Sequence, residues 1–231
     1  MNKIQMSDAT GSFATKDLRN TEIFKNVEID FWCENTGITK EKISVAIKRL
    51  PAQKNISGEE IEGMDLGSLI DHITSTHHQF TREKAVTIYD LAQKVAYRHS
   101  ETHPEVAKLV TAMFFFLHDL LNHMRREEQI LFPNIKLLLK NKKHSKKGTY
   151  TTFGLIKEWV RLMQKEHHSA CKSFKLFNEL TNNYSVPEDA CSSYKSLFRL
   201  MKEFEAGFLM LVAVENNFLF TRAIIEDEVH D

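Results

Sequence analysis

The stretch FFLHDLLNHMRREEQILFP, residues 115–133, predicts an amphipathic helix with a histidine and a glutamate in its apolar stripe. Steps of four and three residues through this stretch and the preceding turns follow one face of a helix. The residues on that face are Leu109, Met113, Phe116, Leu120, His123, Glu127 and Ile130. Because helical side chains four residues apart lie roughly 6 Å from each other, His123 and Glu127 can reach one cation or two adjacent cations. A single pair of this kind is common in helical proteins, so its meaning depends on the other helices.

Two later segments repeat this periodicity. In the segment expected to form the third long helix, the apolar stripe consists of Ile156, Val160, Met163, His167, Ala170, Phe174 and Phe177. The fourth stripe consists of Leu197, Met201, Phe204, Phe208, Leu211, Glu215 and Phe218. The third stripe therefore contains His167, and in the fourth stripe Glu215 corresponds to Glu127 and Leu211 to His123.

The first long helix is expected from about Asp65 to Ala96. Either of two adjacent histidines could lie in its apolar stripe. A stripe through Ala85, Ile88, Ala92 and Val95 extrapolates back to His78. A second stripe, almost as regular, runs through Ile70, Ile73, His77 and Phe80. Periodicity alone does not choose between His77 and His78.

Four long amphipathic helices joined by loops of intermediate length predict an all-α, up-down-up-down four-helix bundle. Pro104 begins the second helix at a position that tolerates proline, and Pro133 is expected to disturb that helix. The third helix is expected from Thr151 or Thr152, and the sequence SVPEDA predicts the fourth helix start with Ser185 as its cap. Residues 1–57 read as a small helical domain, 58–64 as a linker and 65–231 as the bundle.

Composition limits the classes of function. Lys plus Arg and Asp plus Glu both number 31, so no overall field attracts nucleic acid or an acidic membrane. The lysine-rich residues 140–147 read as a solvated loop. Cys33, Cys171 and Cys191 lie far apart and form no CxxC pair, which argues against a disulfide scaffold or a thiolate zinc site. Without an apolar run of about 18 residues or a signal-peptide core near Met1, we expect a soluble, cytoplasmic protein.

Ionised glutamates inside an apolar bundle cost several kcal/mol unless they are paired or bind a metal. No lysine or arginine lies in the same stripes, so divalent cations are the simplest partners for Glu127 and Glu215. Mixed nitrogen and oxygen ligands suit iron or manganese, with zinc as an alternative. The alternative for each histidine is a hydrogen-bonded core residue. His99 lies roughly 31 Å from His78 along a continuous helix, so these two cannot share one site.

Several motifs together resemble one family. They are HMRREEQILFP, LMQKEHHSA, VENNFLFTRA, PEDACSSYKSLF, LIDHITSTHHQFTRE and the N-terminal VEIDFWCENTG. Over roughly residues 20–226 the chain is similar to the hemerythrin-like RIC proteins, the repair-of-iron-centres family. The resemblance implies a non-haem di-iron centre held by His78, His123, Glu127, His167 and Glu215.

The chain departs from the family pattern in the regions that carry chemistry. Leu211 replaces a ligand histidine, and Trp32 replaces the first of two adjacent cysteines. Further departures are Glu34, Asn35 and Thr221. Cys171, four residues after His167, is either a ligand or a packed thiol, and Cys33 is either a reactive thiol or a half-buried one.

The resemblance implies repair of iron–sulfur clusters after nitrosative or oxidative damage, by iron release or nitric oxide handling, with iron–sulfur proteins as recipients. Such a protein is a metal-binding repair factor rather than a typical enzyme, and its state as monomer or homodimer is open. One alternative is a metal-poor interaction or regulatory module, in which Glu215 is neutral or paired with an arginine such as Arg222. Another is an oxygen or nitric oxide sensor.

Overall fold

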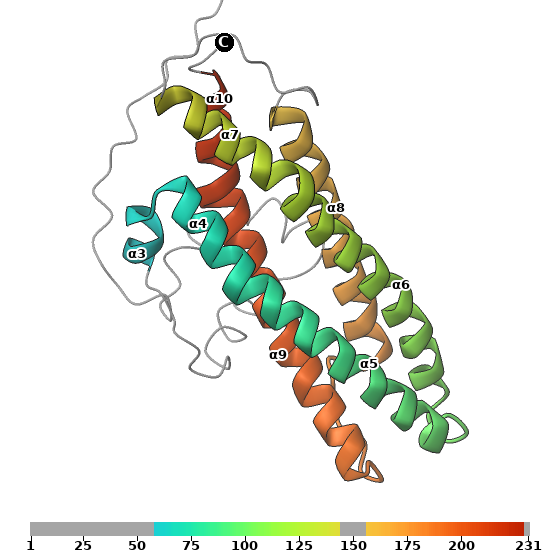
Figure 1. Ribbon diagram of the computed structural model, residues 1–231. Coiled ribbons are helices and arrows are strands. Elements are labelled where there is room, and N and C mark those ends of the chain that lie inside the picture. Colours follow the sequence, from blue (N-terminus) through green and yellow to red (C-terminus); the bar gives the residue numbers. More distant parts are fainter. Residues whose placement is uncertain (1–57, 144–155, 229–231) are drawn as a thin grey trace, which may run out of the picture.

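The computed structural model describes residues 58–143 and 156–228, and over these residues the chain consists of helices joined by turns and loops, with no strand (Figure 1). After the short α3, Gly58–Gly63, four long helices follow. The elements are α4 Leu66–His72, η2 Ile73–His78, α5 Gln79–His99, α6 Pro104–Arg126, η3 Glu127–Leu131, α7 Phe132–Lys143, α8 Ile156–Leu180, α9 Ser192–Val214, η4 Glu215–Phe220 and α10 Thr221–Glu228. The first long helix consists of α4, η2 and α5, and the second of α6, η3 and α7. The third is α8 alone, and the fourth consists of α9, η4 and α10.

The long helices form a ring in which each packs against its two neighbours. Helix α5 contacts α6 and α9, and α8 contacts α6 and α10. Successive helices run in opposite directions along the bundle (Figure 1). The predicted all-α, up-down-up-down four-helix bundle is therefore confirmed.

The predicted domain boundaries stay predictions, because residues 1–57 lie outside the described part of the chain, as does the expected start of the third helix at Thr151 or Thr152. Within residues 58–64, α3 places Ile61 in the apolar core of the bundle. Asp65 then caps α4, and its carboxylate accepts hydrogen bonds from the backbone amides of Gly67 and Ser68.

Three of the four long helices contain a wide π-helical turn. These turns are η2, η3 and η4, and predicted ligands occupy their ends: His78 ends η2, Glu127 begins η3 and Glu215 begins η4. Wide turns of this kind are frequent at functional sites because they rotate side chains relative to a regular helix. The helix continues through Pro133 as α7, since the wider turn before it relieves the clash between the proline ring and the preceding turn.

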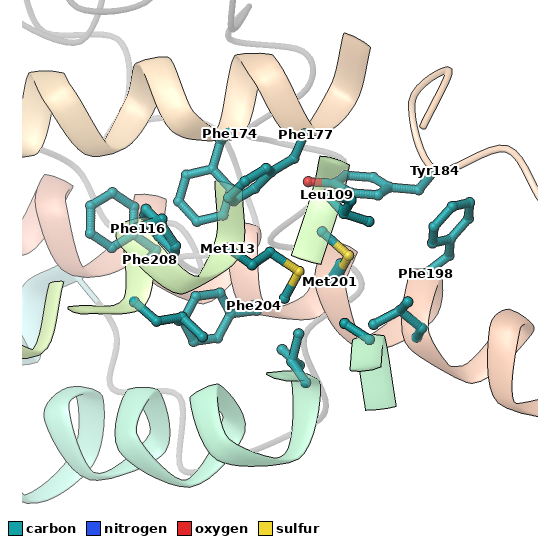
Figure 2. Packing of buried hydrophobic residues seen from close by; sticks show 14 of the residues in the cluster. Leu109, Met113, Phe116, Phe174, Phe177, Tyr184, Phe198, Met201, Phe204 and Phe208 are labelled. Carbon is teal, nitrogen blue, oxygen red and sulfur yellow. The ribbon is translucent and has the colours of Figure 1, made fainter. Parts of the chain in front are cut away.

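The apolar core consists of two clusters on either side of a polar layer. The first lies between α5, α6, α8 and α9 and is rich in aromatic rings (Figure 2). Phe116 is central to it: its ring centroid lies 4.9–6.4 Å from those of four other phenylalanines, Phe174, Phe177, Phe204 and Phe208. The second cluster includes Ile61, Leu69, Leu131, Leu211 and Phe220. Burial of both clusters is the main stabilising contribution to the bundle.

The predicted start of the fourth helix was wrong. Helix α9 begins at Ser192 after Cys191, not at Ser185. The backbone amide of Ser185 donates to the carbonyl of Thr181, which closes the turn at the end of α8. Asn182, Asn183 and Tyr184 adopt positive φ values of 47°, 57° and 57°, so the chain reverses here before the last helix forms.

The last helix, Ser192–Glu228, is long and apolar enough to cross a membrane by length and composition. Most of its apolar stretch is buried inside the bundle. A buried core helix passes the same test, and this one is consistent with a soluble protein.

Candidate metal centre

All five predicted ligand residues converge between the two apolar clusters. The ligand atoms of His123, Glu127, His167 and Glu215 lie within 4.8 Å of one another. His78 joins them, because its Nε2 lies 3.3 Å from a Glu127 oxygen and 3.5 Å from a Glu215 oxygen. The five side chains are almost completely buried. Their role as metal ligands stays a prediction, but their proximity satisfies its first requirement.

The two carboxylates lie between two groups of imidazoles. Glu127 directs one oxygen toward His78 and the other toward His123, whose Nε2 is 3.4 Å away. Glu215 directs one oxygen toward His78 and the other toward His167, at 3.1 Å. The Nε2 atoms of His123 and His167 are themselves 3.1 Å apart. This arrangement suits two adjacent cations that share both carboxylates, with two imidazoles at one end and one at the other.

The donor atoms fit a cation better than they fit each other. The Nε2 of His78 and both oxygens of Glu127 and Glu215 are buried without an aligned hydrogen bond. Leaving such atoms unpaired in a protein interior costs several kcal/mol. Their separations of 3.1–3.5 Å are close to the roughly 3 Å between neighbouring ligands around an ion bound at about 2.1 Å. The cluster therefore has the composition, spacing and unmet bonding of a metal site.

Each histidine is oriented by an acceptor on its outer nitrogen. The Nδ1 of His78 donates to Glu128 at 2.7 Å and that of His123 donates to Glu166 at 2.8 Å. The Nδ1 of His167 faces the Asn216 side-chain oxygen at 3.3 Å. Because these oxygens accept hydrogen bonds, Nδ1 carries a hydrogen, and Nε2 is the ring atom that faces the cluster and can bind a cation or a proton there.

Two arginines fix the outer carboxylates. Arg82 donates to Glu128 and Arg126 donates to Glu166, each at 2.6 Å. Sequence reasoning missed both glutamates, although each is adjacent in the chain to a predicted ligand. A carboxylate next to a stripe residue was the available signal.

The electrostatics of the cluster favour ionised carboxylates and added positive charge. Burial disfavours the charged form of His78, but the negative charge and close contact of Glu127 and Glu215 outweigh this effect and raise the pKa of His78 to about 10. Burial alone would raise the pKa of Glu215, but His167 and His78 lower it to about 2. The buried cluster therefore binds positive charge, either protons or metal.

Of the two adjacent histidines, His78 lies in the cluster and His77 lies beside His72, with ring centroids 5.4 Å apart. Burial lowers the pKa of His77 to about 4. Leu211 is buried in the second apolar cluster, one turn before Glu215. Among the described residues, His78 is the one imidazole in contact with the Glu127 and Glu215 oxygens that point away from His123 and His167.

The thiols and Arg222 lie elsewhere or outside the described residues. Cys171 packs in the phenylalanine-rich cluster and is absent from the converging ligand group. Cys33 lies outside the described ranges. Arg222 donates to the backbone carbonyl of Met64 at 2.7 Å and makes no ion pair with Glu215 among the described contacts. His99 lies at the far end of α5, as its distance along the helix requires.

A cavity of about 310 Å³ leads to the two-imidazole end of the cluster. Its lining includes His123, His167, Phe208 and the Arg126–Glu166 pair. The cavity is large enough for water or a diatomic molecule. Small ligands can therefore approach the donor atoms from this side.

An antiparallel four-helix bundle with a buried histidine or glutamate from every long helix, converging on one cluster, is typical of a class of cation-binding protein. The chain belongs to the hemerythrin family: the model of the hemerythrin HHE cation binding domain matches residues 68–223.

The chain is also similar along most of its length to iron–sulfur cluster repair proteins. It is 29% identical over 225 residues to a probable iron-sulfur cluster repair protein of Haemophilus influenzae, covering 89% of this chain and 92% of that one. It is 27% identical over 227 residues to the iron-sulfur cluster repair protein YtfE of Yersinia pestis, covering 94% and 97%. The resemblance to the RIC family is confirmed.

Proposed function

We propose that this protein holds a non-haem di-iron centre and repairs iron–sulfur clusters damaged by nitrosative or oxidative stress. The observation that carries the proposal is the pair of buried carboxylates, Glu127 and Glu215, each shared between His78 and a histidine of the opposite end. The similarity to iron–sulfur cluster repair proteins supports the repair role. We further propose a cytoplasmic location, with iron–sulfur proteins as recipients and no nucleic acid or membrane partner.

Some residues of the site would hold the iron ions, and others orient the imidazole rings. Glu127 and Glu215 would hold both ions, His123 and His167 one of them, and His78 the other. Glu128, Glu166 and their arginines keep the imidazoles in the ligand tautomer. Nitrogen and oxygen donors of this kind suit iron, which when bound supplies exchangeable ferrous ions and an affinity for nitric oxide.

The two ends of the site differ in imidazole content, and this difference favours iron release. Leu211, one turn before Glu215, offers only an apolar side chain. At the His78 end, His78 would be the one nitrogen donor beside Glu127 and Glu215, so this end would hold a cation more weakly than the end with His123 and His167. We infer that the His78 end gives up its iron first.

Repair can be tested with a recipient whose [4Fe–4S] cluster has been degraded by nitric oxide. The iron-loaded protein is added anaerobically, and recovery of cluster absorbance and recipient activity is followed. We expect recovery with the wild-type chain and none with Glu127→Ala. Equal recovery with free ferrous iron at the same concentration would contradict a repair function.

Loss of the fourth-helix histidine specifically favours a second candidate, a metal-poor regulatory or interaction module. For that function we expect Glu215 to be neutral or paired with an arginine such as Arg222. The lowered pKa of Glu215 and the contact of Arg222 with Met64 argue against both conditions. A gas sensor is the third candidate, and it would bind nitric oxide reversibly without restoring clusters in the same assay.

A further inference from the structure

A second cluster of titratable side chains lies at the end of the bundle where α5 ends and α9 begins, the lower end in Figure 1. The Nε2 of His99 lies 3.2 Å from the Sγ of Cys191. Helix α5 spans 21 residues between His78 and Ser100, so this pair lies roughly 30 Å from the metal centre. It is too distant to contribute to metal binding.

The surroundings of Cys191 favour its thiolate. Cys191 precedes the first residue of α9, where backbone amides carry partial positive charge. The amide of Tyr194, the ring of His99 and the amide of Ser193 lower the pKa of this thiol to about 7, against an opposing effect of burial. A thiol with such a pKa is partly ionised near neutral pH and reacts as a nucleophile.

Neighbouring groups hold His99 in place. Its ring packs against Tyr194 and His103, at centroid distances of 5.3 and 6.2 Å. The Nε2 of His103 bonds to Asp189 at 2.9 Å, and its Nδ1 to Glu105 at 3.1 Å. These contacts connect the α5–α6 turn to the segment before α9. Ring packing therefore fixes the position of His99 beside Cys191, and the hydrogen bonds of His103 fix the ring that packs against His99.

Accessibility distinguishes Cys191 from the other described cysteine. Cys191 is half-buried at the bundle end, whereas Cys171 is buried in the phenylalanine-rich cluster. A small reagent can therefore reach Cys191 without opening the core. Cys171 provides an internal reference for a packed thiol.

We propose that Cys191 is a reactive thiol, activated by His99, that exchanges with low-molecular-weight disulfides. The Cys191 thiolate attacks one sulfur of the disulfide, a new S–S bond forms to Cys191, and the other half leaves as a thiolate that takes up a proton. Excess small thiol reverses the exchange. The S–S bond of the small disulfide breaks as the new one forms, so Cys191 is oxidised, the small disulfide is reduced and no other oxidant is needed.

Oxidised glutathione tests this proposal on the full chain under anaerobic conditions. Peptide mass mapping follows the addition to each cysteine at a series of pH values. We expect Cys191 to react much faster than Cys171, with a pH–rate midpoint near 7. A midpoint at 8.5 or above, or reaction no faster than that of Cys171, would overturn the proposal.

His99→Gln tests the dyad, with His118→Gln as the matched control because the His118 side chain is exposed on α6. Loss of the imidazole should move the midpoint to higher pH and slow the exchange at pH 6 by roughly tenfold. His118→Gln should leave both unchanged. Unchanged kinetics in folded His99→Gln would remove His99 from the proposal, and the wild-type pH profile remains decisive if the variant fails to fold.

Discussion

The three cluster histidines owe their orientation to residues outside the predicted stripes. His123 illustrates this dependence: Glu166 from α8 accepts its Nδ1 hydrogen, and Arg126 from α6 holds Glu166. An outer acceptor of this type increases ligand basicity and fixes the ring. The candidate metal site therefore depends on glutamates that no metal would touch.

Glu166→Ala should weaken metal binding by roughly 10- to 100-fold, because His123 loses its acceptor while every predicted ligand remains. Chelator competition measures the change. Glu158→Ala is the control, since Glu158 is exposed on the same helix and pairs only with Arg161 among the described ion pairs. Equal affinity of the two variants would show that Glu166 has no role in the site.

Leu211→His should strengthen binding at the His78 end by about tenfold or more, because the new imidazole lies one turn before Glu215. Stepwise ferrous titration resolves the weaker binding event. Leu211→Gln has a similar volume and no imidazole, and should give no gain. If both variants bind like wild type, position 211 does not face the weaker ion.

Periodicity located His123, Glu127, His167 and Glu215 because each one replaces an apolar side chain in a regular stripe, whereas His78 was selected by the family resemblance. It left His77 and His78 unresolved, since the π turn η2 alters the helical phase at that point. It missed Glu128 and Glu166 because they lie one residue off the stripes. Their pairing with His78 and His123 depends on how neighbouring helices are aligned, which periodicity does not report.

At the level of elements, helix positions followed from apolar periodicity, whereas one connection did not. The helices that begin at Leu66 and Pro104 agree with the expected positions. The last helix begins seven residues after the expected cap Ser185, at Ser192. Ser185 instead bonds into the turn that ends α8, and tertiary packing of Tyr184 determines that turn. Local capping signals alone could not predict this outcome.

Two adjacent phenylalanines on α6 test the assignment of helix faces. Phe116→Ala should destabilise the bundle by about 3–5 kcal/mol, because it removes a ring that packs against four others. Phe115→Ala should change the free energy of unfolding by less than about 0.5 kcal/mol, since Phe115 is 62% exposed. Denaturant unfolding measures both. Similar losses in the two variants would contradict the stated orientation of α6.

In the whole molecule, a polar layer of histidines and glutamates separates two apolar clusters. All four long helices contribute a donor to this layer, so a bound cation would connect every helix of the bundle. The cavity beside His123 and His167 gives small molecules access to one end, while the Cys191 dyad occupies the far end. Metal chemistry and thiol chemistry would then take place in separate parts of one bundle.

Iron content per chain is the most direct test of whether the buried carboxylates hold two iron ions. Protein purified anaerobically is saturated with ferrous iron, desalted and analysed for metal and protein. The account predicts about two irons per wild-type chain and loss of binding in Glu127→Ala, because Glu127 contributes to both positions. A wild-type chain that retains no iron, or a Glu127→Ala variant that retains as much as wild type, would contradict it.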